Sequence, residues 1–162
     1  MATSDNRSRI LADLKTTFES ITTANGYKTD VANVEQRAKV WTQVGPAYRP
    51  WIGVSPGVVR LEHQPGGVIR CTFRIEVIGL IAAGTPSARS DALNDLLDDI
   101  LAAVQVDTTR GEDPVNAPNR NATMTTVVEF QTDEGDIEDR QDGGILRAAL
   151  EVVYFRTTSA ST

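Results

Sequence analysis

Two residues of this 162-residue chain could support nucleophilic chemistry: its single histidine, His63, and its single cysteine, Cys71. A thiol becomes a strong nucleophile when a base lies beside it, and His63 is the one imidazole available. We expect a hairpin with its turn at 64–67, which would place His63 on one strand and Cys71 on the other. A Cys71–His63 dyad across the hairpin is therefore one interpretation. A free cysteine among apolar strand residues more often packs as a small hydrophobe, and a histidine beside a turn is commonly exposed. We therefore expect structural roles for both.

The acidic segment from Asp133 to Asp142 is the candidate metal site. A calcium loop needs oxygen ligands at alternating positions, a central glycine and a distant bidentate glutamate. Here one alternate register holds Asp133, Gly135, Ile137 and Asp139, so the pattern fails. We expect a solvated loop between two strands. A second interpretation stays open, in which the carboxylates line a passage, repel DNA and so let it slide.

The known phosphate-binding glycine patterns are missing from the chain. The sequence contains neither G-x-x-x-x-G-K-[ST] nor G-x-G-x-x-G. A single histidine also excludes metal sites built on histidine pairs. We therefore expect no catalytic residues, no metal ligands and no cofactor, and we expect that the protein is not an enzyme.

Composition favours one globular domain spanning residues 1–162, with frayed ends at 1–3 and 157–162. Lys and Arg number 16 against 22 Asp and Glu, for a net charge of −6, which disfavours sequence-independent nucleic-acid binding. One cysteine cannot form an internal disulfide, which suits a reducing compartment. The N-terminus lacks an apolar signal core, and no run is long enough to span a membrane. We expect a soluble protein made in the cytoplasm.

Two amphipathic helices are expected. The first runs from Ser4 to Asn25, capped by Ser4 and ended by Gly26, with an apolar stripe at Ile10, Leu14, Phe18 and Ile21. The second begins after Thr85, with Pro86 as its first residue, and runs to about Val104 or Gln105. Its stripe is formed by Leu93, Leu96, Leu97, Ile100, Leu101 and Val104, with Asp91, Asp95 and Asp98 opposite.

Strands are expected between and after these helices. The clearest is 68–82, with Ile69, Cys71, Phe73, Ile75 and Val77 on one face. Further strands are expected at 27–34, 51–54, 58–63, 124–131 and 145–156, with turns at 55–57 and 64–67, an irregular stretch at 35–50 and a polar loop at 108–122. This order predicts an α+β fold, a mostly antiparallel sheet with two amphipathic helices packed on one face.

Three sets of polar or aromatic residues are candidate contacts with a partner. The aspartates of the second helix form either a solvated face or a contact with a basic partner. Arg70, Arg74 and Arg147 lie on strand faces opposite the apolar ones, which would suit lateral packing between copies. Trp41 and Trp51 are either core residues, the reading that we favour, or contact anchors.

The order of these segments resembles the tail terminator family of long-tailed bacteriophages, also called tail-completion or minor tail proteins. The resemblance runs from about Arg9 to Thr157 and rests on "GYKTDV", "GVIRCTFRIEVIGLIAAG", "SDALNDLLDDILAAV", "TTVVEFQTDEGD" and "GILRAALEVVYFRT". It is weakest from Arg37 to Gly66.

The resemblance implies a subunit of a homohexameric ring in the virion, at the neck of the tail. Such a ring caps the tail tube by contacting the major tail tube protein and presents a surface to the head-completion protein. DNA passes through its centre without specific binding, and the family offers no catalytic residues to carry over. Three alternatives stay open: another neck component such as a head–tail joining protein, a small enzyme using Cys71 or the acidic segment, and a ligand- or peptide-binding module.

Overall fold

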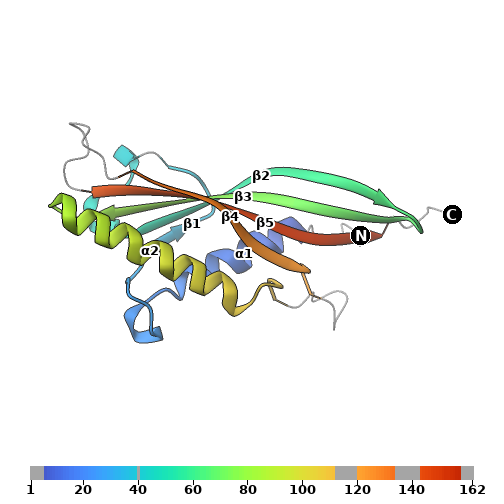
Figure 1. Cartoon of the computed structure of the whole chain (residues 1–162), viewed down its shortest axis with the longest axis horizontal. Coiled ribbons are helices and arrows are strands. Elements are labelled where there is room, and N and C mark those ends of the chain that lie inside the picture. Colours follow the sequence, from blue (N-terminus) through green and yellow to red (C-terminus); the bar gives the residue numbers. More distant parts are fainter. Residues whose placement is uncertain (1–5, 40, 112–119, 134–142, 158–162) are drawn as a thin grey trace.

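The chain forms a five-stranded sheet with two long helices against it (Figure 1). The computed structural model describes residues 6–39, 41–111, 120–133 and 143–157. The helices are α1 (Asn6–Glu19) and α2 (Pro86–Val106), and the strands are β1 (Asn33–Glu35), β2 (Trp51–Gln64), β3 (Val68–Ala82), β4 (Met124–Asp133) and β5 (Gly143–Thr157). Short 3-10 turns lie at η1 (Thr23–Asn25), η2 (Trp41–Gln43) and η3 (Pro46–Tyr48). The fold is therefore α+β, as predicted.

The strands lie in the order β1-β2-β3-β5-β4. β1 is parallel to β2, and every other neighbouring pair is antiparallel. β3 pairs with β5 along its full length, from Val68 to Ala82. The predicted strand at 68–82 and its hairpin with β2 are confirmed, and Gly66 and Gly67 supply the positive φ angles of 83° and 74° in the turn.

Both helices pack on the same face of the sheet and bury one continuous core. Successive residues of a strand point to opposite faces, so every second residue of β3 and β5 reaches the helices. The predicted stripes of both helices meet these residues. The core includes Ile10, Leu14 and Phe18 of α1, Leu93, Leu96 and Ile100 of α2, Cys71, Phe73, Ile75 and Val77 of β3, and Leu146, Ala148, Leu150, Val152 and Tyr154 of β5. This confirms the predicted packing.

β2 is one unbroken strand, so the predicted turn at 55–57 is wrong. The register with β3 shifts between Pro56 and Val59, where two residues of β2 oppose one of β3, which is a β-bulge. A Cβ on Gly57 would lie 2.8 Å from the carbonyl oxygen of Arg74, so the bulge needs glycine there. Pro56 is tolerated because β1 accompanies β2 only as far as Gly53, leaving an edge beyond it.

The predicted strand at 27–34 is wrong over most of its length. The backbone N–H groups of Lys28 and Thr29 donate to the carboxylate of Asp99 on α2 at 2.7–3.1 Å, instead of to a neighbouring strand. Val31 N–H donates to the carbonyl of Ile21 at 3.0 Å. Only β1, from Asn33 to Glu35, joins the sheet. Asp99 is 4% exposed on the helix, and no local sequence signal links it to residue 28.

The first helix ends earlier than predicted. α1 stops at Glu19, and the chain then makes the 3-10 turn η1, which Gly26 closes in the left-handed conformation at φ 89°. Ile21 still enters the core. The predicted N-cap Ser4 lies outside the described residues. At α2 the predicted cap is confirmed, because the Thr85 hydroxyl accepts from the N–H of Ala88 at 3.2 Å.

The far ends of β2, β3 and β5 project past both helices (Figure 1). Burial along β2 falls accordingly, from the fully buried Trp51 and Ile52 to exposed residues at its end. Leu61 lies opposite Cys71 on the helix side of the sheet, yet is 56% exposed because neither helix extends over it. No described helix is both long and apolar enough to cross a membrane.

Candidate functional site

The structure does not form the Cys71–His63 dyad. Cys71 is fully buried in the core, and its Sγ lies 4.0 Å from the carbonyl of Ile69. The hairpin register places Cys71 opposite Leu61, whereas His63 lies opposite Ile69 and is exposed. The thiol therefore packs as a small apolar group, which is the structural role expected of it.

Residues 53–57 read Gly-Val-Ser-Pro-Gly, a G-x-S-x-G pattern that was not among the predicted sites. In hydrolases this pattern places serine on a sharp turn between a strand and a helix, beside a histidine. Here all five residues lie within β2, and Ser55 pairs with Glu76 of β3. The single histidine, His63, is eight residues further along the same strand, roughly 26 Å away at 3.3 Å per residue. The serine therefore has no imidazole to activate it.

Two of the acidic candidates are bound within the chain, and most of the segment 133–142 lies outside the described residues. The described part contains no group of three or more potential metal ligands, and of the segment 133–142 it includes only Asp133. On α2, Asp95 and Asp98 bind the Lys28 ammonium at 3.5 and 2.7 Å. Two of the three predicted aspartates thus bind Lys28, in the segment that follows α1.

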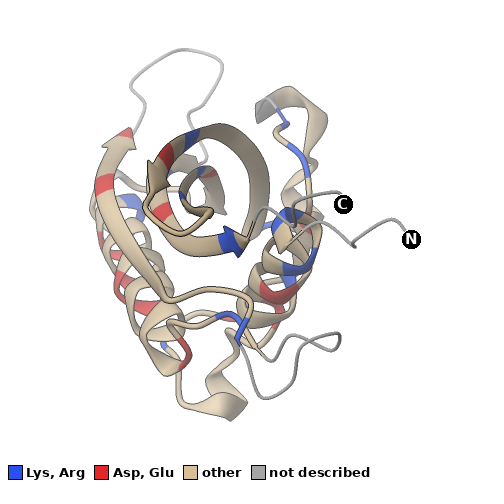
Figure 2. Cartoon of the chain, turned by 90° about the vertical axis from the view of Figure 1, so that its right-hand side faces the viewer, with Lys and Arg blue, Asp and Glu red and all other residues tan. Residues whose placement is uncertain are grey.

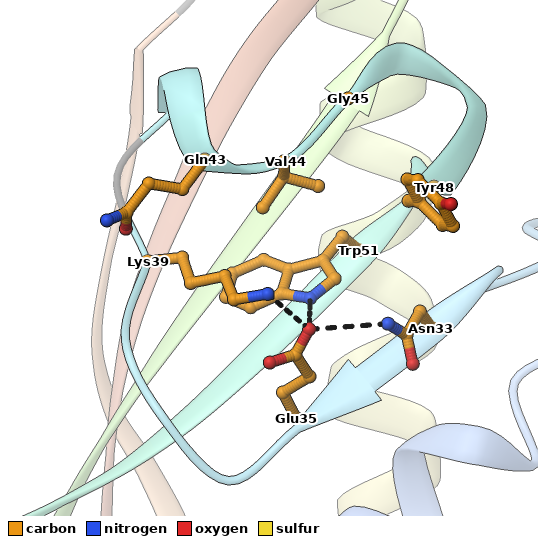
Figure 3. Close-up of a pocket in the computed structure, with 8 residues that line it drawn as sticks. All are labelled: Asn33, Glu35, Lys39, Gln43, Val44, Gly45, Tyr48 and Trp51. Carbon is orange, nitrogen blue, oxygen red and sulfur yellow. Dashed lines mark hydrogen bonds and ion pairs between the residues drawn. The ribbon is translucent and has the colours of Figure 1, made fainter.

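A cavity of about 250 Å³ opens beside β1 and the two turns that follow it (Figure 3). Trp51 is fully buried and packs with Val44, Leu80 and Ile145 on the face of the sheet opposite the helices. The segment 36–50 therefore covers the near end of that face. The prediction that Trp51 is a core residue is confirmed.

Glu35 lies at the centre of this cavity and accepts from four side chains. Three donors are Lys39 Nζ at 2.6 Å, and Trp51 Nε1 and Asn33 Nδ2, each at 3.4 Å (Figure 3). The fourth is Arg37 Nε at 2.5 Å. The bond from Lys39, then that from Arg37, lowers the pKa of Glu35 from 4.5 to about 2. The carboxylate is thus fully engaged by its own chain.

Replacing Glu35 by glutamine is expected to weaken the fold above pH 5 and to flatten its acid sensitivity. The folded pKa lies below the unfolded one, so the Glu35 contribution is complete above about pH 4.5 and is lost as the pH falls towards 2. We expect a loss of about 1 kcal/mol at pH 7, well below what the shift alone would give, since Glu35 and Lys39 side chains remain 21% and 20% exposed. Urea unfolding at several pH values measures this.

The matched control is Glu62→Gln, because Glu62 is 59% exposed and binds Arg70 on the surface. Its expected effect is within about 0.5 kcal/mol. An E35Q variant that loses stability equally at pH 7 and pH 2.5 would contradict the assignment.

Beyond segment 36–50, the sheet face opposite the helices is open and carries arginines and carboxylates. Arg70 binds Glu62 of the neighbouring strand at 3.0 Å. Arg74 binds Glu76 at 2.8 Å and reaches across β5 to Glu129 of β4 at 3.0 Å. Viewed end-on, the strands curl strongly and the two signs of charge are interspersed on them (Figure 2). We call this surface the open face.

Both edges of the sheet lack a neighbouring strand among the described residues. β1 covers β2 only at Trp51–Gly53, so β2 from Ser55 to Gln64 is unpaired on its outer side. β4, from Met124 to Asp133, is the last strand of the sheet, and no described strand lies on its outer side. We call these the β2 edge and the β4 edge. Each presents ten residues of backbone to solvent, a surface that pairs readily with another strand.

Large apolar side chains are exposed on both edges. Val58 and Leu61 on the β2 edge are 66% and 56% exposed, and Met124, Val128 and Phe130 on the β4 edge are 51%, 45% and 56% exposed. They account for five of the eight large apolar side chains that are exposed in the described part of the chain. Sequence periodicity did not reveal the exposure of Phe130, because Phe130 lies on the helix side of β4 and yet is 56% exposed, whereas Thr125 on the same strand is buried.

A buried arginine that sequence reasoning missed fixes the chain after α2. Arg110 is fully buried, donates to the carbonyl of Val104 at 2.9 Å and lies 3.3 Å from the Asp13 carboxylate. Burial lowers the pKa of Arg110 and raises that of Asp13 in spite of the ion pair. Asn121 donates to the Arg110 carbonyl at 2.7 Å, which ties together the two described ends of the predicted loop 108–122.

No protein-family model matches the chain, and no curated protein matches its sequence.

Proposed function

We propose that this protein is a structural subunit of a ring that terminates the tail tube of a long-tailed bacteriophage. In this role the ring contacts the tube protein on one side and the head-completion protein on the other, and DNA passes through its centre. Two observations support this proposal: the order of segments resembles the tail terminator family, and the described residues form exposed sheet edges. Another neck component, such as a head–tail joining protein, would use the same surface features.

The observation that carries the proposal is that one subunit has two different sheet edges, the β2 edge and the β4 edge, with which no described strand pairs. A closed ring needs a heterologous contact, in which one surface of a subunit meets a different surface of the next. An uncovered edge with exposed apolar side chains is a liability for a protein that stays monomeric. In a ring, both edges of every subunit are covered.

The charge of the chain suits a channel through which DNA slides. On the open face Arg70 and Arg74 are bound by carboxylates, and the whole chain has a net charge of −6. Repulsion between an acidic protein and the DNA backbone prevents tight binding. The cavity beside Glu35 adds no competing function, because its carboxylate is held by the chain's own donors.

Electron microscopy of the purified protein tests this proposal. Negatively stained particles are expected to be rings with an axial opening, all of one diameter. Fields that contain only single chains or clusters without symmetry, at every protein concentration examined, would contradict it.

The double change Cys71→Ala and His63→Gln is expected to leave particle size and shape unaltered. His63 is exposed, and Cys71→Ala removes one buried sulfur at a cost of about 1 kcal/mol. Size-exclusion chromatography with light scattering measures the particle. If an activity is found and this double variant abolishes it, the structural role is wrong.

A further inference from the structure

We infer that a second copy of this chain lays its β2 edge against the β4 edge of the first, so that the two sheets continue into one another. The inference rests on the proposed ring and specifies which surfaces join. The occupant of each edge is therefore the same protein.

Strand directions allow this join to be repeated around a ring. β2, β3, β5 and β4 lie in that order, and each is antiparallel to the next. β4 therefore runs opposite to β2 of its own subunit. A neighbour related by rotation about an axis along the strands keeps this direction, so its β2 is antiparallel to β4 of the first copy. The alternation of strand directions therefore continues from one subunit to the next.

The two edges also match in the polarity of their faces. Leu61 pairs with Cys71, and Phe130 pairs with Ala148, so both lie on the helix side of the sheet. Arg60 pairs with Thr72, and Glu129 pairs with Ala149, so both lie on the opposite side. Joining the edges places apolar side chains next to one another on the helix side and places Arg60 near the oppositely charged Glu129 on the other side.

Charge complementarity selects a register. The Arg60 side chain makes no hydrogen bond or ion pair with another described residue, whereas Glu129, at the middle of the β4 edge, is bound by Arg74 of its own chain through one oxygen and remains 67% exposed. Placing Arg60 opposite Glu129 in an antiparallel pair also places Val59 opposite Phe130, and it places Leu61 at the bulge of β4, where Val128 is the extra residue. One register thus brings together the opposite charges and the exposed apolar side chains.

Pairing of two β4 edges is disfavoured by their charge. Among residues 124–133 the charged side chains are Glu129 and Asp133, both acidic, and Arg74 of the same chain binds Glu129. Like charges on facing strands destabilise the pair. The β2 edge instead carries one Arg60 and one Glu62, and Glu62 is already bound by Arg70. The edges therefore favour a head-to-tail contact.

A pair of cysteines tests the contact and its direction. In the Arg60→Cys, Glu129→Cys double variant, the introduced thiols face each other only between copies. Within one chain, β3 and β5 lie between Arg60 on β2 and Glu129 on β4. Following the pairing across the sheet, Arg60 is level with Val153 of β5, whereas Glu129 pairs with Ala149 of β5. This separation of more than about 10 Å is too long for a disulfide. The native Cys71 is fully buried and gives the same background in every variant.

After mild oxidation the double variant is expected to give a ladder of covalent oligomers on a non-reducing gel. An equal mixture of the two single variants is expected to stop at dimers. Each single variant alone is expected to stay a monomer on the gel.

Dimers from either single variant alone would overturn the inference in favour of a two-fold contact. A double variant that does not cross-link, although light scattering still shows an oligomer, would also overturn it and leave the proposed ring standing. Absence of both cross-links and oligomer would refute the inference and the ring together.

Discussion

Replacing Phe130 by aspartate is expected to separate the particle into folded single chains. Phe130 is 56% exposed on the β4 edge, so the isolated subunit loses little by the change. In the ring its side chain would be covered by the next copy, and an unpaired carboxylate at that position costs about 3 kcal/mol or more per contact. Light scattering is expected to show the mass of one chain, with an unchanged circular dichroism spectrum.

The matched control is Tyr48→Asp, an aromatic-to-aspartate change at a side chain that is 62% exposed in η3, away from both edges. This variant is expected to keep the particle mass of the wild type. If F130D assembles as the wild type does, β4 is not an assembly edge. If Y48D separates the particle as well, the contact is not specific to β4.

Replacing Arg110 by alanine is expected to cost about 3 kcal/mol of unfolding free energy. The change leaves the Asp13 carboxylate and the Val104 carbonyl without the guanidinium that binds them inside the fold. For a chain of this size the midpoint of thermal unfolding is expected to fall by roughly 10 °C. Differential scanning calorimetry and urea unfolding measure both quantities.

Arg70→Ala is the control, since Arg70 is 39% exposed and its ion pair with Glu62 lies on the surface. Its expected cost is below about 1 kcal/mol. A loss of less than 1 kcal/mol in R110A would show that the buried guanidinium does not stabilise the fold through these contacts.

The elements with a regular local pattern were predictable from sequence. β3 alternates apolar and polar residues from Ile69 to Val77, and α2 combines a broad apolar stripe with a Thr-Pro start. The glycine pair at 66–67 marks the turn between β2 and β3. In each case the residues that decide the structure are close neighbours in the chain.

The failures occurred where distant residues decide the local structure. The alternation at 27–34 predicted a strand, but the carboxylate of Asp99, 71 positions after Lys28, takes the backbone donors. Ser-Pro-Gly at 55–57 predicted a turn, but pairing with β3 holds those residues in a strand, with a bulge. Gly57 fits because the Arg74 carbonyl approaches it, and that approach exists only in the folded sheet.

The candidate site was predictable only in part. The alternation of β3 indicated that Arg70 and Arg74 lie on the face away from the core, and the structure places them there. Which strands lie at the edges depends on the order of the sheet, which sequence periodicity does not contain. For the same reason the exposure of Leu61 and Phe130 could not be foreseen, because alternation marks both as core residues.

Native mass spectrometry of the purified wild-type protein tests the central claim most directly. We expect one dominant species, a closed oligomer of about six copies of the 17.6-kDa chain, with no series of open oligomers of increasing length. A spectrum that shows only the single chain across all protein concentrations, with both sheet edges therefore left uncovered, would contradict it.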